Sequence, residues 1–149
     1  MTEPSRPTIH INPLDGWAGS APSDAAVEAA ARAALATGPA EGAELSIAFV
    51  SAESIRALNR DYHGADGVTD VLAFGLGADP WLGDVYVCPE VADASAREMG
   101  LDPAEEILRL VIHGVLHLLG HDHPDGEARY GSPMFRLQER LLAEVRGRA

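Results

Sequence analysis

The spacing of apolar side chains along the chain follows two periods, and each period predicts one kind of element. Leu45, Ile47 and Phe49 alternate with Ser46 and Ala48, which indicates a strand with one buried face. Similar short apolar segments bounded by turn residues predict three more strands, at residues 8–12, 69–74 and 84–88. The last two segments flank a glycine-rich connection, which favours antiparallel pairing between them.

Helical spacing accounts for much of the remaining chain. Ser23 is placed to cap an alanine-rich helix, and Ser51 to cap a second helix in which Ile55, Leu58 and Tyr62 share one face. A third helix is predicted from residue 89 to about residue 99. A last helix is predicted to begin after residue 132, with an apolar stripe of Met134, Leu137, Leu141 and Val145.

Residues 102–120 predict the central helix of the fold. Asp102 is placed to cap it, Pro103 to begin it, Glu105 to complete an acidic capping box and Gly120 to end it. Apolar residues cover most of its circumference, which is typical of a buried helix. We therefore expect an α+β fold in a single domain of residues 1–149, with a small mixed sheet of about four strands and helices packed around this buried helix.

Composition and charge narrow the class of protein. The longest apolar stretch is interrupted by Arg109, His113 and His117, so no membrane span is expected, and the absence of an apolar signal core favours a cytoplasmic protein. A single cysteine agrees with a reducing compartment. The net charge is −12 and the chain has no lysine, which argues against a protein that coats DNA or other nucleic acids. Phosphate binding is therefore expected to be local, from a few arginines and a metal.

The central helix carries the most specific chemical signal. His113 and His117 are four residues apart, so their rings share one face of the helix and can bind one ion. A turn at Gly120 can return His123 as a third ligand, which leaves a fourth position open to water. Each imidazole left unpaired in an apolar helix costs about 1–3 kcal/mol, and a shared metal satisfies both. We predict one divalent ion, zinc, in a hydrolase; histidines held only by hydrogen bonds are the alternative.

The histidine spacing also fits the frame of the metzincin proteases. Met134 lies downstream, where a Met-turn is sought. Gly114, however, stands where those proteases have a glutamate as general base, and glycine has no side chain to move a proton. The peptidase assignment therefore lacks its key residue.

The segment from His113 to His123, HGVLHLLGHDH, resembles the HGxLHLxGYDH signature of the YbeY family, bacterial metallo-endoribonucleases specific for single strands. Residues 58–74, LNRDYHGADGVTDVLAF, are similar to the family's LNxxYRxKDxPTDVLSFP. Residues 83–90 are similar to its GDIxIS strand and residues 134–142 to its closing helix.

This resemblance implies one zinc ion per chain and a substrate of single-stranded RNA. It also implies a role in ribosome biogenesis: maturation of the 3′ end of small-subunit ribosomal RNA and removal of defective ribosomes. The implied partners are ribosomal RNA, the small ribosomal subunit and its assembly factors. The residues themselves support a dication with neutral ligands, which suits an anionic phosphodiester.

The chain departs from the family pattern beside the predicted site. His63 stands where the family has an arginine thought to bind phosphate, and it lacks the permanent forked charge of arginine. Arg60, one helical turn earlier, could supply that charge or be a solvated surface residue. His121 replaces a family tyrosine and could be a proton shuttle, a stray ligand or an exposed substitution. We predict His113, His63 and Arg60 as catalytic residues.

Three further residues near the motifs have open or structural roles. Asp122 could orient a ligand imidazole or close the local turn. Asp70 is predicted to close the loop before its strand, and Cys88 to be a buried strand residue rather than a ligand.

Three functions are therefore compared: a zinc endoribonuclease, a metalloprotease or other zinc hydrolase, and a non-catalytic ribosome assembly factor with a structural metal. The nuclease is preferred because the family likeness extends far beyond the histidines. The open ligand position argues against a structural metal, because structural zinc sites are normally closed by four protein ligands.

Overall fold

The computed structural model describes residues 6–14, 17, 19, 21–78 and 81–146. The strands are β1 (Thr8–Asn12), β2 (Glu44–Phe49), β3 (Val71–Ala78) and β4 (Trp81–Val87). The helices are α1 (Asp24–Leu35), α2 (Ala52–His63), α3 (Pro89–Met99), α4 (Pro103–Leu118) and α5 (Pro133–Arg146), with a 3₁₀ helix, η1 (Gly126–Gly131), before α5. Within these described ranges, no helix is long and apolar enough to cross a membrane.

The four strands form one mixed sheet in the order β1-β2-β4-β3. β1 pairs in parallel with β2, because α1 lies between them and returns the chain to the same end of the sheet. β2 pairs in parallel with β4, because β3 runs back along the sheet before β4 begins. β3 and β4 pair antiparallel, with Leu72 opposite Tyr86. The predicted α+β class, with a mixed sheet of four strands, is therefore confirmed.

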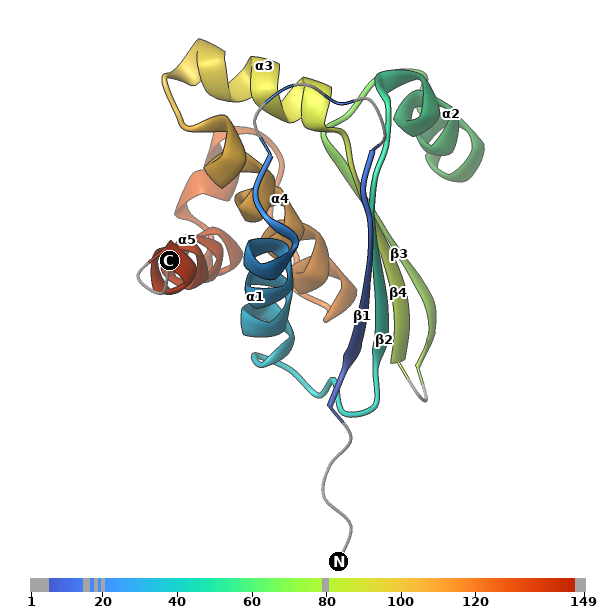
Figure 1. The fold of residues 1–149 in the computed structure, drawn as a ribbon, viewed down its shortest axis with the longest axis vertical. Helices are drawn as coiled ribbons and strands as arrows, with labels where there is room; N and C mark the ends of the chain where they lie inside the picture. The colour runs from blue at the N-terminus through green and yellow to red at the C-terminus, as the bar shows by residue number, and fades with distance from the viewer. Residues whose placement is uncertain (1–5, 15–16, 18, 20, 79–80, 147–149) are drawn as a thin grey trace, which may run out of the picture.

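The helices form a layer on one face of the sheet (Figure 1). α1 and α4 lie against this face, and α5 packs against both of them. α3 crosses one end of the layer. α2 lies on the opposite face of the sheet, near the residues at which β3 begins (Figure 1). This arrangement surrounds α4 with the sheet and three other helices.

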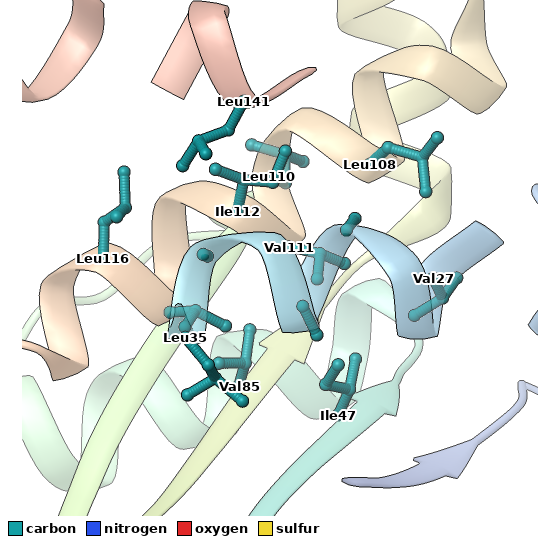
Figure 2. Close-up of a cluster of buried hydrophobic side chains, with 14 of the residues drawn as sticks. Val27, Leu35, Ile47, Val85, Leu108, Leu110, Val111, Ile112, Leu116 and Leu141 are labelled. Atoms are coloured by element: carbon teal, nitrogen blue, oxygen red, sulfur yellow. The ribbon is translucent and has the colours of Figure 1, made fainter. Parts of the chain in front are cut away.

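The main hydrophobic core is built around α4 (Figure 2). Leu141 of α5 points towards Leu110 and Ile112 of α4, and the same cluster includes Leu35 of α1 and Val85 of β4. Full burial of one such aliphatic side chain contributes about 1.5–3 kcal/mol. The predicted buried central helix is thus confirmed, and its position in the core fixes the histidines that it carries.

The ends of α4 follow the predicted signals with one exception. The Asp102 side chain accepts a hydrogen bond from the Ala104 backbone N–H, and Gly120, at φ +96°, ends the helix in a conformation that favours glycine. Glu105 does not fold back to complete the capping box. Its carboxylate lies 3.0 Å from the guanidinium of Arg146, because α5 brings a permanent positive charge beside it.

Gly114 allows α4 to approach the sheet closely. A Cβ atom at this position would lie 2.7 Å from Cγ1 of Val85 and 3.4 Å from Cγ2 of Val71. The first distance is too short for two carbon atoms in contact, and the second is at the lower limit of an ordinary contact. Residue 114 therefore faces β3 and β4, and a larger side chain there would push the helix away from the sheet.

One local expectation was wrong. The predicted loop through Gly75 and Gly77 is part of β3, which continues to Ala78 because a register shift between the two glycines keeps the strands paired. Ile55 and Tyr62 share one face of α2 as expected, since Phe74 packs against the cluster of Ile55 and also against the Tyr62 ring, which is itself 69% exposed.

Candidate metal centre

Three histidine side chains meet at the end of α4. His113 and His117 come from its last two turns, and the chain reverses after Gly120 to bring back His123. The ring centroids are 4.6, 5.1 and 5.0 Å apart, and one nitrogen from each ring lies within 4.8 Å of the others. The predicted ligand set is therefore brought together.

Each of the three rings has an oxygen acceptor at Nδ1. Nδ1 of His113 lies 2.7 Å from Oε1 of Gln138, and the backbone carbonyls of His121 and Pro124 lie 3.2 and 3.0 Å from Nδ1 of His117 and His123. These oxygens favour a proton on every Nδ1, which leaves the Nε2 lone pairs free.

The Nε2 atoms of His113 and His117 are 3.0 Å apart. Two lone pairs at this distance repel each other unless a proton or a cation lies between them. Two nitrogens bound at 2.0–2.1 Å to one tetrahedral ion would be separated by about 3.3 Å. The donor set and its spacing therefore fit a divalent metal.

A chain of polar contacts behind His113 fixes the orientation of its partner. The Gln138 amide donates to Oε2 of Glu139 at 3.1 Å, so its oxygen must face His113. Glu139 is held in turn by two hydrogen bonds from Arg109, of 2.9 and 3.1 Å. Sequence reasoning missed these residues. The available signal was a glutamine on the buried face of the last helix, where an unpaired amide is costly.

The surroundings of the site keep the imidazoles of His113 and His117 neutral and the guanidinium of Arg109 charged. Burial lowers the pKa of His113 to about 4, although the bond to Gln138 opposes the shift. Burial and the nearby His123 lower the pKa of His117. Burial alone would lower the pKa of Arg109, but its bonds to Glu139 and its pairing with Glu106 raise it. Neutral imidazoles are the form that binds a metal.

A cavity of about 380 Å³ opens beside the histidines, between α3, α4, η1 and α5. Its lining includes His113 and His123 together with Asp70, Arg109, Arg129 and Tyr130. Neither the 3₁₀ helix nor its two cavity-lining residues were predicted. The short segment has no apolar period, and its position depends on how the chain returns from the metal centre to α5.

The structure does not bring Arg60 or His63 to this cavity. Arg60 is exposed and lies 3.4 Å from the carboxylate of Asp61 on α2. The His63 ring stacks on Phe74, with centroids 5.4 Å apart, and Phe74 packs against the cluster of Ile55, Leu72 and Cys88 rather than against the core around α4. Their catalytic roles stay a prediction.

The residues between and beyond the ligands have definite places. Asp122 accepts a hydrogen bond from the backbone of His123 and so closes the local turn. His121 contributes its backbone carbonyl to His117. Met134 lies buried in the first turn of α5, on the apolar stripe predicted for the last helix, and it therefore does not form a Met-turn.

Two residues with predicted structural roles also lie near the site or core. The backbone carbonyl of Asp70 accepts from the Cys88 N–H, which fixes the entry to β3, and the Asp70 side chain lines the cavity. Burial raises the pKa of this carboxyl. Cys88 is fully buried, at the N-cap of α3 rather than in the strand, and belongs to a small cluster with Ile55 and Leu72.

The fold and the site define an α+β protein with three histidines placed to hold a metal beside a cavity of about 380 Å³. The position of Gly114 separates it from the metzincin proteases. Because residue 114 packs on Val85, it has no space for the glutamate that acts as base in those enzymes.

Comparison with known proteins identifies the family. The family described as Endoribonuclease YbeY matches residues 20–146. The Endoribonuclease YbeY of Salinispora tropica is 44% identical over 138 residues, which cover 81% of this chain and 87% of the relative. That of Alkalilimnicola ehrlichii is 40% identical over 143 residues, covering 91% and 85%. The chain belongs to the YbeY family, and its relatives support an endoribonuclease, a hydrolytic enzyme.

A solved structure agrees with this assignment. The solution structure of TM1509 from Thermotoga maritima superposes with a TM-score of 0.63 and is 30% identical, covering 95% of this chain and 91% of that one.

Proposed function

We propose that this protein is a zinc-dependent, single-strand-specific endoribonuclease of ribosome biogenesis. Its substrate is ribosomal RNA, its reactions include maturation of the 3′ end of small-subunit RNA, and it contributes to ribosome quality control. The observation that carries the proposal is the convergence of three imidazole rings, each with one nitrogen within 4.8 Å of the others, in a chain whose relatives are named endoribonucleases.

His113, His117 and His123 would hold the metal. Three neutral nitrogen donors suit zinc, although other transition metals of similar preference can occupy such sites. A dication bound there would polarise a phosphodiester and make a water molecule more acidic. His113 is then a catalytic residue through the metal, as predicted.

The chain's own residues prepare the site for this chemistry. Gln138 keeps the proton of His113 on Nδ1, and the buried Arg109 and Glu139 hold Gln138 in place. These contacts hold the ring of His113 in the orientation and protonation form that a metal requires. The adjoining cavity supplies a partly enclosed space in which a strand can be held against the site.

Arg60 and His63 have a separate place in the proposal. Both lie at the end of α2, away from the cavity lining, where Arg60 is exposed. We assign them to contacts with RNA that extends beyond the metal centre. Arg60 supplies a permanent charge and His63 supplies hydrogen bonds, because a neutral imidazole cannot form the forked contact of an arginine.

The expected setting is cytoplasmic, with the small ribosomal subunit and its assembly factors as partners and all 149 residues forming one domain. At a net charge of −12 the protein gains little from general attraction to RNA. Selectivity for one RNA site is therefore assigned to partners and to the few local arginines.

The test compares cleavage of single-stranded RNA, double-stranded RNA and a denatured protein by the purified chain. We expect zinc to copurify, only single-stranded RNA to be cut, and chelation or His117→Ala to abolish cutting. His10→Ala is the matched control, because His10 is an exposed histidine of β1 that lies beside Glu44, far in the sequence from the three-histidine cluster. Chelator-sensitive cutting of protein alone would favour the metalloprotease. Bound zinc without any cleavage would favour the assembly factor.

A further inference from the structure

Exposed apolar side chains gather at the cavity beside the metal centre. Among the described residues, five large hydrophobic side chains are exposed, and three of them, Met99, Leu101 and Tyr130, line this cavity. They come from the end of α3, the following turn and η1. Apolar surface that stays exposed in one place marks a binding site more often than scattered single residues do.

Arg129 is the cation of this lining that remains available. Arg109, which also lines the cavity, is engaged by the carboxylates of Glu106 and Glu139 at 3.0 and 2.9 Å. Arg129 forms no ion pair with any residue in the described part of the chain. Its Nη2 donates to the Tyr130 hydroxyl at 2.8 Å, and its guanidinium lies 4.9 Å from the centre of that ring.

The charges inside the cavity determine the orientation in which a ligand binds. Asp70 and Glu106 also line it, and carboxylates disfavour a second anion close by, although the charge of Arg129 opposes the rise in the pKa of Asp70 that burial causes. A phosphate is therefore expected at the mouth, beside Arg129 and the histidines. An aromatic base, which is uncharged and carries N–H donors, suits the apolar wall and the carboxylates.

We infer that this cavity is a subsite for one nucleotide of single-stranded RNA next to the metal centre. Arg129 binds a backbone phosphate, and the base lies against Tyr130, Met99 and Leu101. The volume of about 380 Å³ falls within the usual range of small-ligand sites. The inference deepens the proposed function and rests on it, because it names the residues that hold the strand.

The test measures binding of a labelled, single-stranded 2′-O-methyl RNA to the zinc-loaded protein by fluorescence anisotropy over a series of salt concentrations, with RNA integrity checked on a gel. Arg129→Ala is expected to raise Kd about tenfold and to reduce the slope of log Kd against log salt by about 0.7. Arg140→Ala is the matched control. It removes the same charge from an arginine whose side chain is 67% exposed on α5 and does not line the cavity.

Tyr130 is tested in the same assay. Tyr130→Ala is expected to raise Kd about tenfold without changing the salt slope, and Tyr130→Phe to retain most of the affinity, because stacking needs the ring. A nucleoside 5′-monophosphate should displace the RNA from wild type better than inorganic phosphate does, and Arg129→Ala should remove this advantage. Circular dichroism of each variant checks the fold.

Equal effects of Arg129→Ala and Arg140→Ala would overturn the inference, as would unchanged binding in Tyr130→Ala or equal competition by phosphate alone. The proposed function fails in a different way. Binding that depends on Arg129, together with no cleavage of unmodified RNA by the wild type, would contradict the nuclease and leave the subsite standing. Cleavage without such dependence would contradict the subsite alone.

Discussion

Oε1 of Gln138 lies 2.7 Å from Nδ1 of His113, and this contact links the last helix to the metal centre. The Gln138 amide can face only one way, because its nitrogen donates to Glu139. The proton of His113 is therefore held on Nδ1, and Nε2 is presented with a lone pair beside His117. A residue 25 positions away in the sequence thus decides the form in which His113 meets a metal.

Removing this acceptor should weaken metal binding without unfolding the protein. Gln138→Met nearly preserves the volume of the side chain, but its thioether sulfur is only a weak hydrogen-bond acceptor. We expect its zinc Kd to rise about 10–100-fold, the usual effect of losing a contact behind a metal-bound histidine. Competition with a chromophoric chelator measures this Kd, and urea unfolding of the metal-free protein checks stability. An unchanged zinc Kd in a folded variant would show that the contact with Gln138 does not hold His113 in the form that binds metal.

Because Gly114 lies so close to the sheet, adding one methyl group at this position should destabilise the fold. Gly114→Ala places a Cβ 2.7 Å from Val85 and should lower the free energy of unfolding by about 1–3 kcal/mol in urea. The matched control is Gly67→Ala, since nothing lies within 4 Å of a Cβ there. Shortening Val85 to alanine in the Gly114→Ala background should recover part of the loss, as a double-mutant cycle would show. Equal effects of the two glycine variants would contradict the packing argument.

The low pKa of His113 predicts that the metal-free protein loses stability in acid. Between pH 6.5 and about 4 the ring stays neutral in the folded chain, whereas the unfolded chain protonates it with a pKa near 6.5. The unfolded state binds more protons, so the free energy of unfolding falls as pH falls, by up to about 3 kcal/mol at pH 4.

Urea unfolding at several pH values, with a chelator present, measures this dependence. His113→Leu should remove its share of the slope. Comparing the two proteins separates this contribution from that of buried carboxyls such as Glu106. Burial raises the pKa of Glu106, so this carboxyl makes the free energy of unfolding rise as pH falls. Identical pH profiles for the two proteins would refute the assignment.

Local sequence signals predicted most of the elements and the three histidines that the structure brings together. Ser23 and Ser51 cap their helices through side-chain bonds to backbone N–H groups, and Gly120 turns the chain where expected. These signals act within a few residues, so they can be seen in the sequence. The spacing of His113 and His117 is equally local, because one helical turn places both rings on one face.

The rest of the site depends on packing between distant segments. The contact of His113 with Gln138 requires α5 to dock on α4, and no local rule gives that docking. The ion pair of Glu105 with Arg146, which replaced the predicted capping contact, has the same origin. The position of Arg129 depends on a 3₁₀ helix that has no apolar period. Non-local contacts of this kind are absent from sequence patterns.

The two residues at the end of α2 can be tested apart from the metal centre. Arg60→Ala should raise KM for RNA about threefold and leave kcat nearly unchanged, since an exposed phosphate contact contributes modestly to binding. His63→Arg should lower KM by a similar factor, because arginine adds a permanent charge. Arg56→Ala is the control for Arg60, because Arg56 lies on the same helix and is paired with Asp66. A large loss of kcat in Arg60→Ala would place that residue at the reacting phosphate instead.

The metal centre is tested most directly by adding zinc back to chelated protein and measuring the rate of single-stranded RNA cleavage. We expect activity to rise linearly and to reach its maximum at one equivalent of zinc per chain. His10→Ala should follow the same curve, and His117→Ala should stay inactive at one equivalent. Full activity of the metal-free protein, or recovery that does not need His117, would contradict a metal centre built from the three histidines.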